Sequence, residues 1–324
     1  MKNRLSPIVA AAFLLLCALV LPASSTEPLK LDLVVPFPQG TTTGQAIEIF
    51  RAPFEKALGQ TVDTVNVNTN QAVDGTRYVA TEKRGNTNTL LITTLTPLVH
   101  AFVLGKPDYD VERDLKPVSF FGAYCFVLVT KRIDGISGVA SFVKWVKERP
   151  GNVKFAAGTF SARILGASLQ QEAGVTFADM ITAQNEGLVT QFLKGGNADA
   201  TIMSLGPIKK YIEDGSLVAL AVVGSKRCPA LPSVPTFAES GLPGIPNAEL
   251  WAAIYAPAGI TKERQSQYAV AVSKALNEPD VRTQIEALGF RVQASSPEWL
   301  EKYRQDQVLF WKDVMKKAGM PVIN

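Results

Sequence analysis

Short apolar runs alternate along most of the chain with longer stretches whose apolar residues recur at helical spacing. The run LDLVV at residues 31–35 is rich in β-branched residues and is typical of a buried strand. After it, apolar residues such as Ala46, Ile47, Phe50 and Phe54 fall on one face of a predicted helix. Repeated alternation of this kind predicts parallel sheets with helices on both faces.

The alternation forms two blocks. A long apolar strand at residues 120–130, FFGAYCFVLVT, separates them and is long enough to pass from one lobe to another. A strand at 217–223 ends the second block, and we expect it to carry the chain back. We therefore predict an α/β fold with two lobes, in which two doubly wound sheets are joined by two crossover strands. Lobe 1 would comprise residues 26–122 and 226–324, and lobe 2 residues 123–225.

In each block a strand ends in a loop of small residues. Residues 40–44 (GTTTG) follow the first strand, and residues 158–161 (GTFS) follow a strand of the second block. A strand, a small-residue loop and a helix N-terminus together aim free N–H groups and a helix dipole at one point, where an anion can bind. Ligands in open α/β sheets lie beyond the carboxyl ends of the strands, so we expect the two loops to face each other across a cleft. A bare turn without a ligand is the alternative for the first loop.

The N-terminus has the pattern of a secretory signal peptide over residues 1–25. Lys2 and Arg4 supply the positive start, residues 8–21 form an apolar core, and small residues precede the expected cut. A retained membrane anchor is the alternative, but the apolar core is too short to span a bilayer comfortably. We expect the mature chain to be exported.

The net charge bears on the class of binding partner, and the cysteine content bears on the cellular compartment. The formal net charge is +4, and no Lys/Arg-rich run or basic stripe with aromatic residues indicates nucleic-acid binding. Cys125 and Cys228 remain after cleavage and could pair in an oxidising compartment, although spacing alone cannot show that they are close. We expect two unrelated buried thiols.

The residue inventory argues against an enzyme. The one histidine, His100, lies in the apolar segment LVHAFVL, which excludes multi-histidine metal sites and makes a Ser-His-Asp triad implausible. The chain has no glycine-lysine phosphate loop, no G-x-G-x-x-G after a strand and no C-x-x-C. We expect no catalysis, no metal and no cofactor.

Four stretches have a distinctive composition and order. They are residues 34–40 (VVPFPQG), 109–118 (YDVERDLKPV), 225–244 (SKRCPALPSVPTFAESGLPG) and 256–259 (APAG). In these stretches the chain resembles the substrate-binding proteins of tripartite tricarboxylate transporters, the Bug family of bacterial periplasmic proteins. The resemblance implies a periplasmic receptor with a type II-like, Venus-flytrap binding-protein fold, and a monomer is the default expectation for a receptor that diffuses. Such a receptor closes about a hinge over a small organic carboxylate and delivers it to the membrane subunits of a transporter.

The resemblance also implies where the ligand binds. In the family, backbone N–H groups of two loops and bridging water hold the ligand carboxylates. Carried over to this chain, the contacts are those of the first loop, a strand-end hydroxyl and the second loop: Pro38, Gly40, Thr41, Thr42, Thr43, Thr94, Gly158, Thr159, Phe160 and Ser161.

The chain departs from the family pattern in the pocket. The family usually has an aspartate where this chain has Gly44, and a glycine-rich turn where it has residues 70–72 (NQA). An Asp-Asn pair common after a later strand is Met203 and Ser204 here, and we expect Ser204 to contact the ligand. The second loop is shorter than in the family.

Further residues are candidates for the pocket on their own chemistry. Arg163 lies one turn into a predicted helix and could clamp a carboxylate bidentately, or it could be a solvated surface residue. Phe160 could stack on an aromatic acid or fill a narrowed pocket. Asn185 and Glu186 follow a predicted strand and either line the cleft or cap a helix.

A second hypothesis is an extracytoplasmic sensor that presents a bound carboxylate to a membrane sensor kinase. The altered pocket favours it, because a receptor that has lost its transporter is free to change specificity. An enzyme on the same fold is a third hypothesis, which the residue inventory disfavours.

Overall fold

The computed structural model describes residues 30–69, 72–95, 97 and 108–320. The predicted signal peptide at 1–25 and His100 therefore lie outside the described residues. Among the described residues, no helix has both the length and the hydropathy needed to cross a bilayer.

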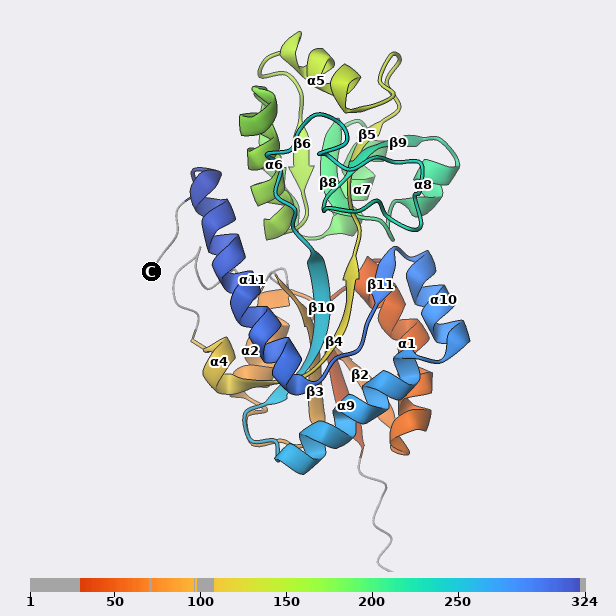
Figure 1. Cartoon of the computed structure of the whole chain (residues 1–324), viewed down its shortest axis with the longest axis vertical. Coiled ribbons are helices and arrows are strands. Elements are labelled where there is room, and N and C mark those ends of the chain that lie inside the picture. The colour runs from red at the N-terminus through yellow and green to blue at the C-terminus, as the bar shows by residue number, and fades with distance from the viewer. Residues whose placement is uncertain (1–29, 70–71, 96, 98–107, 321–324) are drawn as a thin grey trace, which may run out of the picture.

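The strands form two sheets, each the centre of one lobe (Figure 1). The sheet of lobe 1 contains β1 (Leu31–Val35), β2 (Val62–Asn66), β3 (Thr89–Thr94), β4 (Leu115–Tyr124), β10 (Leu250–Pro257) and β11 (Phe290–Val292), in the order β11-β4-β10-β3-β1-β2. The sheet of lobe 2 contains β5 (Phe126–Lys131), β6 (Phe155–Ala157), β7 (Met180–Thr182), β8 (Ala200–Ser204) and β9 (Leu217–Val222), in the order β7-β6-β8-β5-β9.

Helices cover both faces of each sheet. In lobe 1 one face carries α1 (Thr42–Leu58), α9 (Lys262–Leu276) and α10 (Pro279–Ala287), and the other carries α2 (Val73–Thr81), α4 (Val111–Asp114) and α11 (Pro297–Lys317). In lobe 2 one face carries α5 (Val139–Lys147) and α6 (Phe160–Ala173), and the other carries α7 (Glu186–Lys194) and α8 (Lys209–Glu213). The predicted two-lobed α/β fold is confirmed.

Alternation along the strands separates the two apolar layers of lobe 1. On β10, Trp251 and Tyr255 pack toward α11, whereas Ala252 and Ile254 pack toward α1 and α9. All four side chains are buried, because successive residues of a strand point to opposite faces and both faces are covered. α11 runs along lobe 1 and reaches α6 of lobe 2, so it packs against both lobes (Figure 1).

The strands that carry the chain between the lobes are antiparallel to their neighbours in the sheets. β10 pairs antiparallel with β3 and β4, and β5 pairs antiparallel with β8 and β9. β1 pairs parallel with β2 and β3, and β6 pairs parallel with β7 and β8. A strand that enters a sheet from the other lobe starts at the edge where the parallel strands end, so it runs in the opposite direction. Each sheet is therefore mixed: the strands that alternate with helices are parallel, as predicted, and the strands that join the lobes are antiparallel to them.

The crossovers agree with prediction at one of the two places. The apolar run at 120–130 becomes β4 in lobe 1 and β5 in lobe 2, with Cys125 between them. β9, in contrast, lies wholly in the sheet of lobe 2, where Val222 also pairs with Thr236. The chain returns over residues 223–249 and enters lobe 1 as β10. A buried edge strand and a crossover strand have the same apolar sequence pattern. The pattern at 217–223 therefore could not show that this strand stays in lobe 2.

Cys125 and Cys228 form a disulfide bond, so the prediction of two separate thiols was wrong. The Cys125 N–H donates to the carbonyl oxygen of Gly289 in lobe 1 at 2.9 Å, and its carbonyl oxygen accepts from the Leu205 N–H in lobe 2 at 3.2 Å. Cys228 is buried in the core of lobe 2. The disulfide therefore attaches the first crossover, where it leaves lobe 1, to the core of lobe 2.

Candidate functional site

A cavity lies between the lobes, at the carboxyl ends of the parallel strands. Its volume is about 60 Å³, a few times the roughly 10–15 Å³ that one water molecule needs. Both lobes contribute to its wall, which consists of Pro36, Phe37, Pro38, Thr41, Thr43, Asn68, Ala72, Thr94, Tyr124, Phe126, Gly158, Thr159, Ser161, Gln184, Asn185, Glu186 and Ser204.

The lobe 1 side of the cavity is the N-terminus of α1. Thr41 caps this helix: its hydroxyl accepts from the Gly44 N–H at 3.1 Å and donates to the carbonyl oxygen of Pro38 at 2.8 Å. The Gln45 N–H donates to the Thr41 carbonyl oxygen. The amides of Thr42 and Thr43, which helix geometry leaves without a partner, have none among the described residues.

The lobe 2 side repeats this arrangement twice. Thr159 caps α6 by accepting from the Ala162 N–H at 3.1 Å, and Asn185 caps α7 by accepting from the Leu188 N–H at 3.0 Å. The two caps lie close together, because a Cβ atom on Gly158 would be only 2.8 Å from the Glu186 nitrogen. A glycine at 158 lets the two helix N-termini open onto the same space.

Three helix N-termini therefore converge on one cavity, one from lobe 1 and two from lobe 2. Each carries a partial positive charge, and each has first-turn amides that the helix itself cannot satisfy. The described residues that line the cavity include no lysine, arginine or histidine. The positive potential there comes from backbone dipoles, which suits an anion such as a carboxylate.

The lobes touch each other directly beside the cavity. The Thr42 hydroxyl, from lobe 1, donates to the Ser204 hydroxyl of lobe 2 at 2.7 Å and accepts from the Gly206 N–H of lobe 2 at 2.9 Å. Ser204 in turn donates to Glu186, from its N–H to Oε1 at 2.8 Å and from its hydroxyl to Oε2. A continuous hydrogen-bond chain thus runs from α1 across the interface to α7.

Two ionisable side chains face the cavity from the described residues, Glu186 and Tyr124. Burial raises the pKa of the Glu186 carboxyl, and the two hydrogen bonds from Ser204 offset only part of this rise. Burial, followed by the nearby Glu186 carboxyl, raises the pKa of Tyr124. Tyr124 therefore stays a neutral phenol at any physiological pH.

Most of the predicted site residues come together at this cavity. The predicted residues in its wall come from the two loops, from the ends of β3 and β8 and from the turn before α7. They are Pro38, Thr41, Thr43, Thr94, Gly158, Thr159, Ser161, Asn185 and Ser204. The two alternatives for Asn185 both hold in part, since it caps α7 and also lines the cavity.

Four predicted residues lie outside the wall of the cavity. Gly40 is exposed at the start of the first loop, and the Thr42 side chain is at the lobe interface. Phe160 is 7% exposed and belongs to the apolar core, because the first turn of α6 points it away from the cavity. Arg163 donates from Nη1 to the Thr182 hydroxyl at 3.3 Å, on the side of α6 that faces β7. Both interpretations that place Phe160 in the pocket were wrong, and of the two alternatives for Arg163 the one that places it outside the pocket holds.

Other lining residues were missed. Asn68 follows β2, Gln184 follows β7, and Tyr124 and Phe126 flank the crossover. Each lies at or just after a strand end, so the rule that ligands bind at the carboxyl ends of strands could have found them. Among the described residues, no group of three or more His, Cys, Asp or Glu side chains could hold a metal ion.

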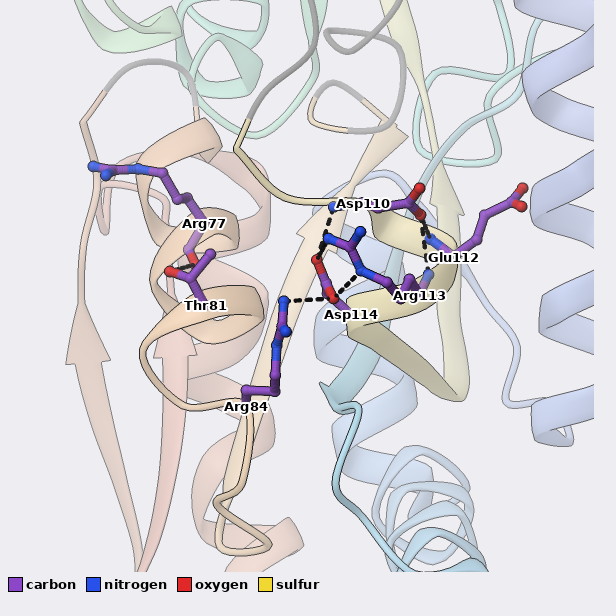
Figure 2. A network of polar contacts seen from close by, with 7 residues as sticks. All are labelled: Arg77, Thr81, Arg84, Asp110, Glu112, Arg113 and Asp114. Carbon is purple, nitrogen blue, oxygen red and sulfur yellow. Dashed lines mark hydrogen bonds and ion pairs between the residues drawn. The ribbon is translucent and has the colours of Figure 1, made fainter.

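The stretch YDVERDLKPV lies away from the cavity and organises lobe 1. Asp114, which is 1% exposed, accepts from Arg84 at 2.8 Å, from Arg113 Nη2 at 2.7 Å and from the Asp110 N–H at 2.9 Å (Figure 2). Arg113, the Asp110 amide and the Arg84 charge lower the pKa of the Asp114 carboxyl to about 2.

The stretch APAG joins the same cluster. The Ala258 N–H donates to the Asp114 carbonyl oxygen and the Gly259 N–H to the Arg84 carbonyl oxygen, each at 3.0 Å. These two stretches therefore hold the scaffold of lobe 1 and do not contact the cavity.

Comparison with known proteins agrees with this architecture. The chain is 28% identical to protein BugT of Bordetella pertussis over 316 residues, which is 96% of each chain. MatC (Rpa3494) from Rhodopseudomonas palustris, solved with bound malate, is 25% identical with a TM-score of 0.79, over 89% of this chain and 99% of that one. R. palustris Rpa4515, solved with adipate, has the same fold at 23% identity, with a TM-score of 0.83 over 90% of this chain and 98% of that one.

A sequence model of one family covers most of the chain. The model described as tripartite tricarboxylate transporter family receptor matches residues 49–320. This range includes β3, the crossovers, all of lobe 2 and the C-terminal helices, and the cavity lies between the two lobes that it spans. With the match extending over both lobes, this chain belongs to the receptor family of the tripartite tricarboxylate transporters.

Proposed function

We propose that this protein binds a small organic carboxylate in the cavity between its lobes and delivers it, unchanged, to a membrane transporter of the tripartite tricarboxylate type. The observation that carries the proposal is the convergence of three helix N-termini on one cavity whose described wall has no cationic side chain. Unsatisfied backbone amides can bind both oxygens of a carboxylate without a charged partner.

The cavity dimensions favour a small acid. A volume of about 60 Å³ accommodates a compact molecule when the lobes are in contact. The structures of two similar proteins contain adipate and malate, both aliphatic dicarboxylates, so acids of this size are the first candidates. Apolar residues Phe37 and Phe126 on the wall suit the carbon chain of such an acid.

Lobe closure would connect binding to delivery. Because the wall comes from both lobes, a ligand that contacts both favours the state in which they touch. We place the hinge at the first crossover around Cys125 and in the returning segment at 223–249. Residues 123–225 with part of this segment would then move as lobe 2 against the rest of the chain.

An exported location is consistent with the disulfide and with the sequence pattern at residues 1–25. Disulfides persist in oxidising compartments such as the bacterial periplasm, and the family is one of transporter receptors. The location is tested by expressing the full chain and fractionating the cells, with the N-terminal residue of the periplasmic form identified by mass spectrometry. Cytoplasmic retention of the uncleaved chain would contradict it.

A thermal-shift screen of the mature chain tests the binding. Malate, succinate, adipate, citrate and benzoate form a suitable panel, with the corresponding amides as uncharged controls. At a concentration of 100 times the dissociation constant, a ligand stabilises the native state by about 2.7 kcal/mol. We expect at least one acid to raise the melting temperature by several degrees and its amide to leave it unchanged.

Asn185→Asp is the variant that tests the site. Aspartate caps a helix as well as asparagine does, so the fold of α7 is kept, while a negative charge is added to the cavity wall. We expect the affinity for the acid to fall at least tenfold, roughly 1.4 kcal/mol. Asn152→Asp, in an exposed turn of the same lobe, is the matched control and should bind normally. Equal binding by both variants would remove the cavity as the site.

A further inference from the structure

Glu186 is a buried acid in a cavity that is otherwise suited to an anion. Its side chain is 6% exposed and lines the cavity, and its partners are the N–H and the hydroxyl of Ser204. No described cationic side chain contacts it. An ionised Glu186 and a bound carboxylate would therefore place two negative charges in one small cavity.

Side chains from four other elements line the cavity together with Glu186. β8 contributes Ser204, β4 contributes Tyr124, α1 contributes the hydroxyl of Thr43 and α6 contributes that of Ser161. None of them is charged, since Tyr124 is a neutral phenol. The first turn of α7, on which Glu186 lies, favours its ionised form, but a helix terminus is worth much less than the cost of burying an unpaired charge.

We propose that the cavity binds its carboxylate ligand together with one proton, and that the Glu186 carboxyl carries this proton. The inference rests on the proposed function. When the lobes are apart, water solvates Glu186 and the side chain is an ordinary ionised glutamate. When the lobes close over an anion, burial and the like charge both favour the protonated form, and the proton comes from the solvent.

The hydrogen bonds around Glu186 allow both protonation states. In the ionised state both carboxylate oxygens accept, from the Ser204 N–H and from its hydroxyl. In the protonated state the carboxyl O–H is a donor that can point at a ligand oxygen or at the Ser204 hydroxyl. Ser204 also contacts Thr42 of lobe 1, so the group that gains the proton is one hydrogen bond away from the contact between the lobes.

Calorimetric titration of the mature chain with malate and with adipate tests the inference. Measuring each binding enthalpy in two buffers of different ionisation enthalpy, at about pH 6 and at about pH 8, gives the number of protons taken up. We expect uptake of about one proton per ligand, and an affinity that falls about tenfold for each pH unit between the pKa of Glu186 in the open state and its raised pKa in the liganded closed state.

Glu186→Gln is the decisive variant, and Glu213→Gln, an exposed residue of α8 in the same lobe, is its matched control. The neutral amide keeps the shape and a donor, so E186Q should bind with no proton uptake and an affinity independent of pH, whereas E213Q should behave as the unmodified protein. If E186Q does not fold, carbon-13 NMR of the glutamate carboxyls in the unmodified protein, with and without malate, reports the same protonation.

The outcomes separate the two proposals. Binding of either acid without proton uptake, or uptake that persists in E186Q, overturns this inference and leaves the proposed function standing. If neither malate nor adipate nor any other acid of the panel binds at either pH, the proposed function fails and this inference fails with it.

Discussion

Gly206 of lobe 2 lies against Thr42 of lobe 1, and its N–H donates to the Thr42 hydroxyl at 2.9 Å. A Cβ atom at this position would be 2.6 Å from the Thr42 hydroxyl oxygen and 3.0 Å from the Thr42 Cα atom. Backbone at that distance cannot move aside without separating α1 from lobe 2. The three atoms nearest to such a Cβ atom all belong to Thr42 of lobe 1, so the glycine matters to the closed state.

Gly206→Ala should weaken ligand binding while leaving the fold intact. Overpacking of a tight contact costs about 1–3 kcal/mol, and here the cost falls on the closed state, so the affinity for an acid should drop roughly 5- to 100-fold. Calorimetry and small-angle scattering measure the affinity and the compaction on binding. Gly138→Ala, which has no atom within 4 Å of its new Cβ, is the control. Unchanged affinity in G206A would mean that closure does not use this contact.

Two residues show where reasoning from side-chain type succeeds and where it fails. Arg163 has the chemistry to clamp a carboxylate, yet α6 turns its side chain toward Thr182. Glu186 is an unlikely lining residue for an anion site by charge alone, yet the packing of α7 against the Gly158 loop puts it on the cavity wall. Residue type states what a side chain can do, and the rotation of its helix decides whether it is positioned to do so.

At the scale of single elements, the four-residue α4 is held by one buried acid. Asp110 caps it by accepting from the Glu112 and Arg113 N–H groups, and Asp114 at its end accepts from both arginines and from Asp110 (Figure 2). So short a helix has little stability of its own. The Asp114 cluster joins it to the segment after α2 and to the start of the segment after β10.

Asp114→Asn should lower the free energy of unfolding by about 2 kcal/mol at neutral pH. Because folding lowers the pKa of Asp114 to about 2, from an ordinary value of 3.8, its stabilising contribution is full above about pH 4 and is lost as the pH falls through about 2. Urea unfolding across this range measures the difference between variant and unmodified protein. That difference should vanish at the acid end. Asp134→Asn, an exposed residue, should show no difference at any pH.

At the scale of the whole molecule, one covalent bond spans the hinge region. The Cys125–Cys228 disulfide joins residues 103 positions apart and closes a loop that contains most of lobe 2. Both neighbours of Cys125 line the cavity, so the position of the crossover strand bears directly on the shape of the site.

Replacing both cysteines by serine should destabilise the protein by about 2–4 kcal/mol, because the open chain gains conformational freedom when unfolded. Denaturant unfolding of the mature chain, with and without a reductant, measures this. The unmodified protein in reductant should unfold at a lower midpoint than in oxidising buffer, whereas the serine variant should be insensitive to the reductant. Equal midpoints for the unmodified protein in both conditions would contradict a stabilising role.

Local pattern was enough to identify most elements, since helical and strand periodicity, caps and turns are properties of short segments. β1 has the predicted bounds, and Ala46, Ile47, Phe50 and Phe54 form the buried face of α1 as predicted. The small-residue loops that follow strand ends also identified the region of the cavity. Parallel strands end at the same edge of a sheet, and ligands bind beyond that edge.

Relations between distant segments were decided only by the tertiary structure. The disulfide, the antiparallel direction of β5 and β10, and the place where the chain returns to lobe 1 all depend on how segments far apart in sequence pack. The burial of Glu186 on the cavity wall is of the same kind, because the sequence left lining the cleft and capping a helix as alternatives for this residue. The sequence alone determined which segments form strands, helices and anion-attracting loops, because backbone and side-chain chemistry act locally. Which side chains meet, and at what charge, was decided by packing, because burial and proximity do not exist until the lobes have formed.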